Sequence, residues 1–342
     1  MSEAPSRWRG LLIVVRLALV AASVWALSRE FAGLTPAALV RELAGYGWSH
    51  ALLGLAAVAA SFLLLGAMEI LALRTHGGGT QRVTARTAIG TAFVSHAVSQ
   101  SAGIALLTGT AVRLRSYQRL GLQPTAVAQV SAAVTLTVTL GLLAAGGWAL
   151  LGHPAPLTLA GHSIPLAPAG TLLCLTVAAY LAWSVFGRGR AAPGRRWGIP
   201  RPRPAIAFAQ VALATVDWLT TGAVLFVFIP PELGFGLVAF LQLYLIAQLI
   251  GVLSHVPAGA GVFEVALLAL LVAARPGADR AGILAAIVMY RALYYILPLA
   301  AAMVLAGGYE WRRRRRAATG AFDVLERPLA PPSVLSLAHD AR

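Results

Sequence analysis

A short break in a long apolar segment constrains the fold more than any other feature. The segment covers residues 236–274, and its interruption at 254–264 contains a proline, two glycines and a carboxylate. Proline ends helices because it lacks a backbone donor, and small residues tolerate irregular backbone. At membrane depth, such backbone is tolerated only where it is buried in protein or lines a cavity. The break therefore predicts a polar path through a membrane, with its carboxylate, Glu264, as a candidate site residue.

The composition predicts an all-α fold, that of a polytopic integral membrane protein. Of the 342 residues, 58% are hydrophobic and only 11% are charged, and the mean hydropathy is +0.77. Several continuous apolar runs approach or exceed the roughly 20 residues that cross a bilayer. We expect about six full spans and two broken or re-entrant helical hairpins. The spans are expected at 10–28, 51–73, 124–151, 168–187, 205–230 and 281–307, and the hairpins at 88–110 and 236–274.

The distribution of arginine predicts the topology. All 27 basic residues are arginines, and they flank apolar runs without forming one basic face, so the net charge of +15 does not indicate a nucleic-acid partner. Placing the arginine-rich loops in the cytoplasm requires 88–110 to enter and leave from the inside, and 236–274 from the outside. Two interrupted segments of opposite orientation are typical of inverted-repeat transporters. The alternative is that each is an ordinary buried helix or helix pair.

The same analysis predicts the domain organisation. Residues 1–316 are expected to form one transmembrane domain, with 188–204 as a basic cytoplasmic linker loop, and 317–342 a disordered cytoplasmic tail. Both termini are then cytoplasmic. The first span could be a cleavable signal peptide, but its length and poor cleavage site favour an uncleaved anchor. The single cysteine, Cys174, lies in an apolar run and can form no intrachain disulfide.

Five charged residues lie within the expected spans or hairpins, where charge is costly unless it is paired or hydrated. They are Arg16, Glu69, Asp217, Glu264 and Arg291. Arg16 can snorkel to the headgroups. Glu69 can reach the interface or pair with Arg74. Asp217 shares a helical face with Thr220 and Thr221, which predicts either a polar functional stripe or a buried ion pair.

Arg291 is the strongest candidate for phosphate binding. Tyr294 and Tyr295 share its helical face, and an arginine with aromatic neighbours suits a phosphate group. Pro298 can kink this helix and free a carbonyl. The alternative is a structural ion pair of Arg291 with Glu264 or Asp217. In segment 88–110, His96 and Gln100 share a face, but such a lone histidine is more often a packing residue than a ligand.

Three blocks of sequence resemble the transmembrane region of the lysylphosphatidylglycerol synthase/flippase family. They are the small-residue stretch from Ser101 that closes on Gly109–Tyr117, the break at His255–Glu264, and the stretch Tyr290–Pro298. Ala258 stands where the family pattern has the first glycine of a pair. The large aminoacyl-transferase domain of bifunctional members has no counterpart here. The resemblance therefore implies a flippase-like membrane module of a bacterial inner membrane, and not the synthase.

The leading hypothesis is a lipid translocase that moves a phospholipid or modified lipid between leaflets. Arg291, Arg113 and Arg115 would meet the phosphate, and Glu264 and Asp217 a cationic headgroup or a proton. The expected substrate-binding residues are Arg113, Arg115, Tyr117, Asp217, Pro257, Gly259, Gly261, Glu264, Tyr290, Arg291 and Tyr294.

Two other hypotheses remain beside the translocase. A lipid-modifying enzyme would need a catalytic constellation, and the sequence has no metal-ligand cluster, nucleotide-binding motif or catalytic triad. No cofactor is therefore expected. A scaffold for a separate lipid synthetase is the second alternative. The expected partners are membrane lipids, anionic or aminoacylated, and a homodimer and a separate synthetase stay open.

Overall fold

The computed structural model describes residues 36–76, 83–102, 105–152, 157–159, 162–187, 202–308 and 311. The expected first span at 10–28, most of the linker at 188–204 and the tail at 317–342 lie outside these residues. The chain divides into two compact units, one up to Leu299 and one from Ala300 onward. In the second unit, the described residues are helical.

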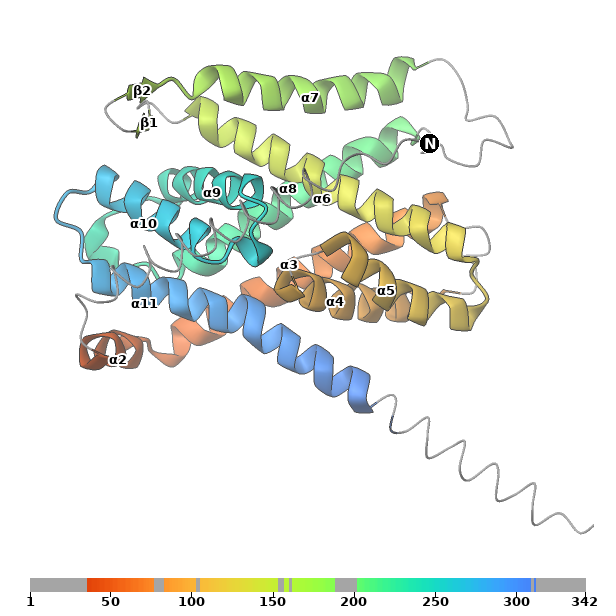
Figure 1. The fold of residues 1–342 in the computed structure, drawn as a ribbon, viewed down its shortest axis with the longest axis horizontal. Helices are drawn as coiled ribbons and strands as arrows, with labels where there is room; N and C mark the ends of the chain where they lie inside the picture. Colours follow the sequence, from red (N-terminus) through yellow and green to blue (C-terminus); the bar gives the residue numbers. More distant parts are fainter. Residues whose placement is uncertain are drawn as a thin grey trace, which may run out of the picture. The chain divides into compact units, whose positions relative to one another are not determined.

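The described part of the chain is built of helices, apart from one small hairpin of strands (Figure 1). The first half contains α2 (Pro36–Gly45), α3 (Trp48–His76), α4 (Ala85–Ala102), α5 (Ala105–Tyr117), η2 (Gln118–Leu120) and α6 (Pro124–Gly152). The antiparallel strands β1 (Leu157–Leu159) and β2 (His162–Ile164) follow. The second half contains α7 (Ala167–Phe186), α8 (Pro204–Phe226), η3 (Pro231–Leu233), α9 (Leu237–Leu253), η4 (Pro257–Gly259), α10 (Val262–Ala274), α11 (Arg280–Arg291) and the π-helical η5 (Ala292–Ile296).

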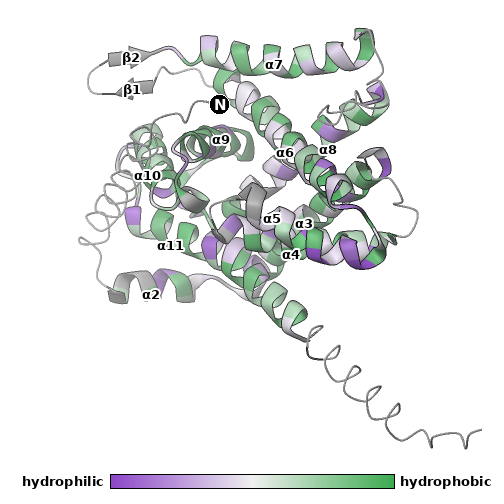
Figure 2. Ribbon diagram, turned by 45° about the vertical axis from the view of Figure 1, so that its right-hand side comes forward, coloured by the Kyte–Doolittle hydropathy of each residue, from purple (hydrophilic) through white to green (hydrophobic). Residues whose placement is uncertain are grey.

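Five helices are long and apolar enough to cross a membrane. They are Trp48–Thr75, Pro124–Gly152, Ala167–Phe186, Pro204–Phe226 and Arg280–Gly308. At a rise of about 1.5 Å per residue, about 20 residues cover the hydrocarbon core. Hydrophobic residues cover α7 and α9 over most of their length in Figure 2. The chain is therefore a polytopic membrane protein, and five of the expected spans are confirmed.

Each of the two unusual segments forms a pair of shorter helices. The expected segment 88–110 falls on α4 and α5, which begin earlier, at Ala85, and end later, at Tyr117, and segment 236–274 contains α9 and α10. In Figure 1 the two helices of each pair lie side by side. Helices α9 and α10 have 17 and 13 residues, so each is about 20–25 Å long, less than the hydrocarbon thickness. The predicted break around Pro257 is confirmed, because α9 ends at Leu253 and α10 begins at Val262.

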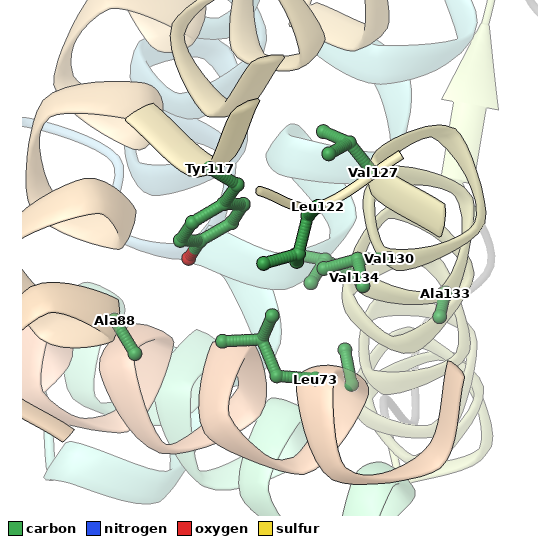
Figure 3. Packing of buried hydrophobic residues seen from close by; sticks show 9 residues of the cluster. Leu73, Ala88, Tyr117, Leu122, Val127, Val130, Ala133 and Val134 are labelled. Carbon is green, nitrogen blue, oxygen red and sulfur yellow. The ribbon is translucent and has the colours of Figure 1, made fainter. Parts of the chain in front are cut away.

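A buried apolar cluster holds the first helix pair against α3 and α6 (Figure 3). Leu73 of α3 and Ala88 of α4 face Tyr117 at the end of α5, and Leu122 follows in the turn before α6. The valines and alanine that α6 adds are Val127, Val130, Ala133 and Val134. Lipid tails are as apolar as these side chains, so close packing rather than the hydrophobic effect holds the cluster together.

Helices α6 and α8 approach each other closely at Gly141. A Cβ atom at Gly141 would lie 2.5 Å from the carbonyl carbon of Ala214 and 2.8 Å from its oxygen. Small residues allow such contacts between membrane helices, and the packing of the two backbones stabilises the crossing. The crossing fixes α8, which carries Asp217 one turn further along.

We expect Gly141→Ala to destabilise the protein. The new methyl group would meet backbone atoms of Ala214 that cannot move without shifting α8, and such overpacking costs about 1–3 kcal/mol. Gly90→Ala is the matched control, because nothing lies within 4 Å of its added Cβ and alanine favours a helix interior by about 1 kcal/mol. Thermal unfolding in detergent should show a lower Tm for Gly141→Ala alone. Equal Tm values for both variants would contradict the close crossing.

Candidate functional site

A cavity of about 560 Å³ lies between the two short helix pairs. Helices α4 and α5 contribute one side of its lining, and α9, α10 and the break between them contribute another. The rest comes from α6, α8, α11 and the π-helical η5, with one residue of α3. Its polar lining includes His96, Gln100, Arg113, Asp217 and Gln248. Two segments that lie far apart in the sequence therefore border one cavity.

A buried ion pair joins the first helix pair to α3. Arg113 of α5 donates from Nε and Nη2 to the carboxylate of Glu69, at distances of 2.7–2.9 Å. Tyr117, one turn on, donates its hydroxyl to Glu69 Oε1 at 2.8 Å. Glu69 is fully buried, so the expectation that it reaches the interface or pairs with Arg74 is wrong. A buried carboxylate needs a cationic partner held in a fixed position. The forked guanidinium of Arg113 matches the two oxygens of the Glu69 carboxylate.

Arg113 connects this ion pair to the cavity. Its Nη2 lies 3.4 Å from Nε2 of His96, and both residues line the cavity. The side chain of Arg115 is exposed and does not line the cavity, because residues two apart on a helix face different directions. Of the two arginines, the structure therefore places only Arg113 at the cavity.

A second ion pair holds the break between α9 and α10. Arg291 of α11 donates from Nε to Glu264 Oε1 at 2.6 Å and from Nη1 to the carbonyl oxygen of Ala258 at 3.1 Å. The other carboxylate oxygen of Glu264 accepts a hydrogen bond from the backbone N–H of Gly261 at 2.7 Å. The guanidinium lies over the ring of Tyr295, 4.3 Å from its centre. Of the two pairings left open by the sequence, the structure has Arg291 with Glu264.

The backbone of the break uses the left-handed region at several positions. Gly259 and Gly261 have φ angles of 60° and 82°, which glycine adopts without strain. Ala258 has a φ of 57° and His255 one of 54°, which cost free energy for residues with a Cβ atom. Gly259 also lies close to α9, because its added Cβ would be 3.5 Å from the Cα atom of Gly251.

Asp217 lies at the edge of a cluster of hydroxyl groups. Ser61 of α3 donates to Asp217 Oδ1 at 2.5 Å, and its oxygen lies 3.0 Å from the hydroxyl of Tyr294 in η5. Thr221 donates to the Tyr294 hydroxyl at 3.1 Å. Thr220, expected on the same face, instead donates to the carbonyl of Val216 on the exposed side. The polar stripe therefore consists of Asp217 and Thr221, and it faces protein.

Tyrosines connect this cluster to the second ion pair. Tyr290 stacks on Tyr294 with ring centres 5.6 Å apart and planes inclined by 8°, and its hydroxyl lies 3.0 Å from that of Tyr244. Tyr294 and Tyr295 belong to the π-helical turn η5, which begins directly after Arg291. Pro298 follows this turn. It has no backbone N–H to donate to the carbonyl of Tyr294, so the regular helical hydrogen bond is missing at this position. Such turns are frequent at functional sites.

Nine of the eleven expected site residues fall into two groups in the structure, and Arg115 and Pro257 belong to neither. The first group lines the cavity: Arg113, Asp217, Gly259, Tyr290 and Tyr294. The second group holds the cavity walls: Tyr117, Gly261, Glu264 and Arg291. Pro257 begins η4 within the break.

Sequence reasoning missed the lining residues Thr135, Trp218 and Gln248, and also Ser61. An isolated serine or glutamine in an otherwise apolar helix was the available signal.

The chain is similar in sequence to several known proteins. An uncharacterized protein of Synechocystis sp., slr0712, is 31% identical over 299 residues, which cover 83% of this chain and 90% of that protein. The inner membrane protein YbhN of Escherichia coli is 26% identical over 72% of this chain and 76% of that protein. A phosphatidylglycerol lysyltransferase of Staphylococcus epidermidis is 32% identical over 95 residues, 28% of this chain and 11% of the enzyme. No protein-family model matches the chain.

The chain belongs to one family with slr0712. It is related to the transmembrane region of the lysylphosphatidylglycerol synthase/flippase family, and the lysyltransferase match covers only a small part of that enzyme. The apolar helices and the similarity to an inner membrane protein make it a multi-pass inner-membrane protein.

We expect Ala258→Gly to stabilise the protein by about 1 kcal/mol, because glycine removes the left-handed strain at a φ of 57°. Ala260→Gly is the matched control, since Ala260 does not have a positive φ and glycine there only adds freedom to the unfolded chain. Thermal unfolding should show a higher Tm for Ala258→Gly than for the wild type, and an equal or lower Tm for Ala260→Gly. A fall in Tm for both variants would contradict the assigned backbone conformation.

Proposed function

We propose that the chain is a lipid translocase that moves a phospholipid or modified lipid between the leaflets of the inner membrane. The observation that carries the proposal is a cavity, bordered by both helix pairs of an apolar bundle, whose largely apolar lining contains His96, Gln100, Arg113 and Asp217. Its volume of about 560 Å³ is in the range of ligand sites. A headgroup would enter the cavity while the acyl chains stay in lipid.

A buried polar atom without a hydrogen-bond partner in the lining supports a polar ligand. Gln100 lines the cavity, and its buried Oε1 atom has no hydrogen-bond partner in the described part of the chain. A buried polar atom without a partner costs free energy, so a ligand donor or water that reaches it gains stability. Arg113 also lines the cavity, and its guanidinium is the group proposed to meet a phosphate.

The membrane topology that accompanies this proposal has two re-entrant hairpins. Helix pairs α4–α5 and α9–α10 are each made of helices too short to span at full length, or barely long enough, which favours hairpins whose tips lie within the membrane. In this topology α4–α5 enters from the cytoplasm, α9–α10 enters from the outside, and both termini are cytoplasmic.

Reconstituted vesicles test the proposal directly. The purified full chain is placed in vesicles that contain fluorescent phosphatidylglycerol, and a membrane-impermeant quencher reports the fraction of label in the outer leaflet. Label should exchange between leaflets faster than in protein-free vesicles. Absence of exchange would reject the translocase and favour a scaffold, and chemical change of the lipid would favour an enzyme.

A bulky residue in the cavity should stop this exchange. Thr139 is exposed and lines the cavity from α6, so Thr139→Trp fills part of the space without disturbing packed residues. We expect at least a tenfold lower exchange rate. Ala132→Trp is the matched control, because Ala132 is exposed on the same helix and does not line the cavity. Equal rates for the two variants would show that lipid does not pass through this cavity.

Variants of the second ion pair test whether Arg291 binds lipid or only pairs with Glu264. Removing one partner of a buried pair costs about 3–5 kcal/mol, so Arg291→Ala should unfold at a lower temperature. The double variant Arg291→Leu with Glu264→Leu removes both charges. If Arg291 binds phosphate, the double variant regains stability but not lipid exchange. Recovery of both would assign Arg291 a purely structural role.

A further inference from the structure

Asp217 differs from the other two buried carboxylates in the described residues. Glu69, Asp217 and Glu264 are all at most 6% exposed. Glu69 is paired with Arg113, and Glu264 with Arg291. Within the described ranges Asp217 has no cationic partner, and its carboxylate accepts a hydrogen bond from the hydroxyl of Ser61. An ionised carboxylate buried in this way costs more free energy than a single hydrogen bond returns, unless a positive charge neutralises it.

The charges of the surrounding groups favour a proton over a divalent metal ion. The groups in contact are one carboxylate and three neutral hydroxyls, with Ser61–Asp217, Ser61–Tyr294 and Thr221–Tyr294 contacts of 2.5, 3.0 and 3.1 Å. These are hydrogen-bond lengths. A divalent cation beside a single carboxylate would leave a net positive charge in this buried site, whereas one proton neutralises the carboxylate.

We propose, building on the translocase function, that Asp217 is a proton-binding site that couples lipid movement to the transmembrane proton gradient. Asp217 takes a proton from water in the cavity that it lines, and releases the proton to water when the cavity opens to the other side. No other reactant is needed, because the proton enters and leaves as hydrated proton.

Tyr294 is the positioning residue that transmits the change of charge. Its hydroxyl contacts Ser61 and Thr221 beside the carboxylate, and it belongs to the π-helical turn that follows Arg291. The next residue, Tyr295, lies under the guanidinium of Arg291, which holds the break through Ala258. A rearrangement of hydrogen bonds at Asp217 therefore reaches the broken helix pair through one short turn of backbone.

Other ionisable groups near Asp217 must be separated from it. Those that line the same cavity are His96, Arg113, His255, Tyr290, Tyr294 and Tyr295. Tyr244 of α9 lies behind Tyr290, and Glu69 of α3 is held by Arg113. Helix α6, which packs against α8, contains no ionisable residue. Among these groups the carboxylates alone have a carbonyl vibration when protonated, so infrared absorption distinguishes Asp217 from the histidines and tyrosines.

The first measurement does not depend on transport. Infrared spectra of the full chain in lipid nanodiscs are recorded over a range of pH. The wild type should show a protonated-carboxyl band that disappears as pH rises, Asp217→Asn should lack it, and Tyr294→Phe should shift the pH at which it disappears. Asp279→Asn is the matched control, because asparagine also caps α11 and the residue lies outside the cavity. A band that persists in Asp217→Asn, or absence of any band in the wild type, would overturn the proposal.

The second measurement uses the phosphatidylglycerol vesicles with a pH difference across the bilayer. The wild-type exchange rate should change several-fold when the gradient is reversed, Asp279→Asn should behave alike, and Asp217→Asn should lose the dependence. A band assigned to Asp217 without any lipid exchange in the wild type would reject the translocase and leave the proton site standing. Exchange without gradient dependence would overturn the coupling. Loss in Asp217→Asn of exchange of cationic-headgroup lipids alone would assign Asp217 to headgroup binding instead.

Discussion

The cost of charge in a low-dielectric environment determines much of this structure. A buried ion is tolerated when a partner of opposite charge meets it with good geometry, and both arginine–glutamate pairs meet that condition. Glu69 with Arg113 fixes the helix pair α4–α5 to α3, and Glu264 with Arg291 fixes the break between α9 and α10 to α11. Each pair thus joins an irregular segment to a long apolar helix. The cavity has defined walls because both irregular segments are held in this way.

The sequence predicted the long helices well because their signal is local. Continuous apolar runs identified α3, α6, α7 and α8 within a few residues, and proline with glycines identified the break after α9. The intramembrane charges were found for the same reason. The partners of these charged residues were harder to predict, because which residues pair depends on how the helices cross. Glu69 lies 44 residues from Arg113, and no local pattern indicated that pair. Tyr117, one turn from Arg113, was chosen as a ligand contact but contacts Glu69.

At the site, the structure differs from the prediction in the helical face on which some residues lie. Thr220 and Thr221 follow Asp217 by three and four positions, and both offsets can share its face on an ideal helix. The crossing of α8 with α3 selects Thr221, whose hydroxyl meets Tyr294, and leaves Thr220 on the exposed side. Arg113 and Arg115 were expected to act together, but two residues apart they point away from each other. The π-helical turn η5 was not predicted, since the sequence indicated only a kink at Pro298.

The neutrality of the two ion pairs has an electrical consequence. An arginine–glutamate pair has no net charge, so a membrane voltage exerts almost no work on it when the surrounding segment moves. One elementary charge that crosses 100 mV changes free energy by about 2.3 kcal/mol. The two compensated pairs therefore add almost nothing to the voltage dependence of any rearrangement of these segments. The net charge of whatever occupies the cavity, together with that of Asp217, contributes to how strongly the membrane potential drives or opposes its passage.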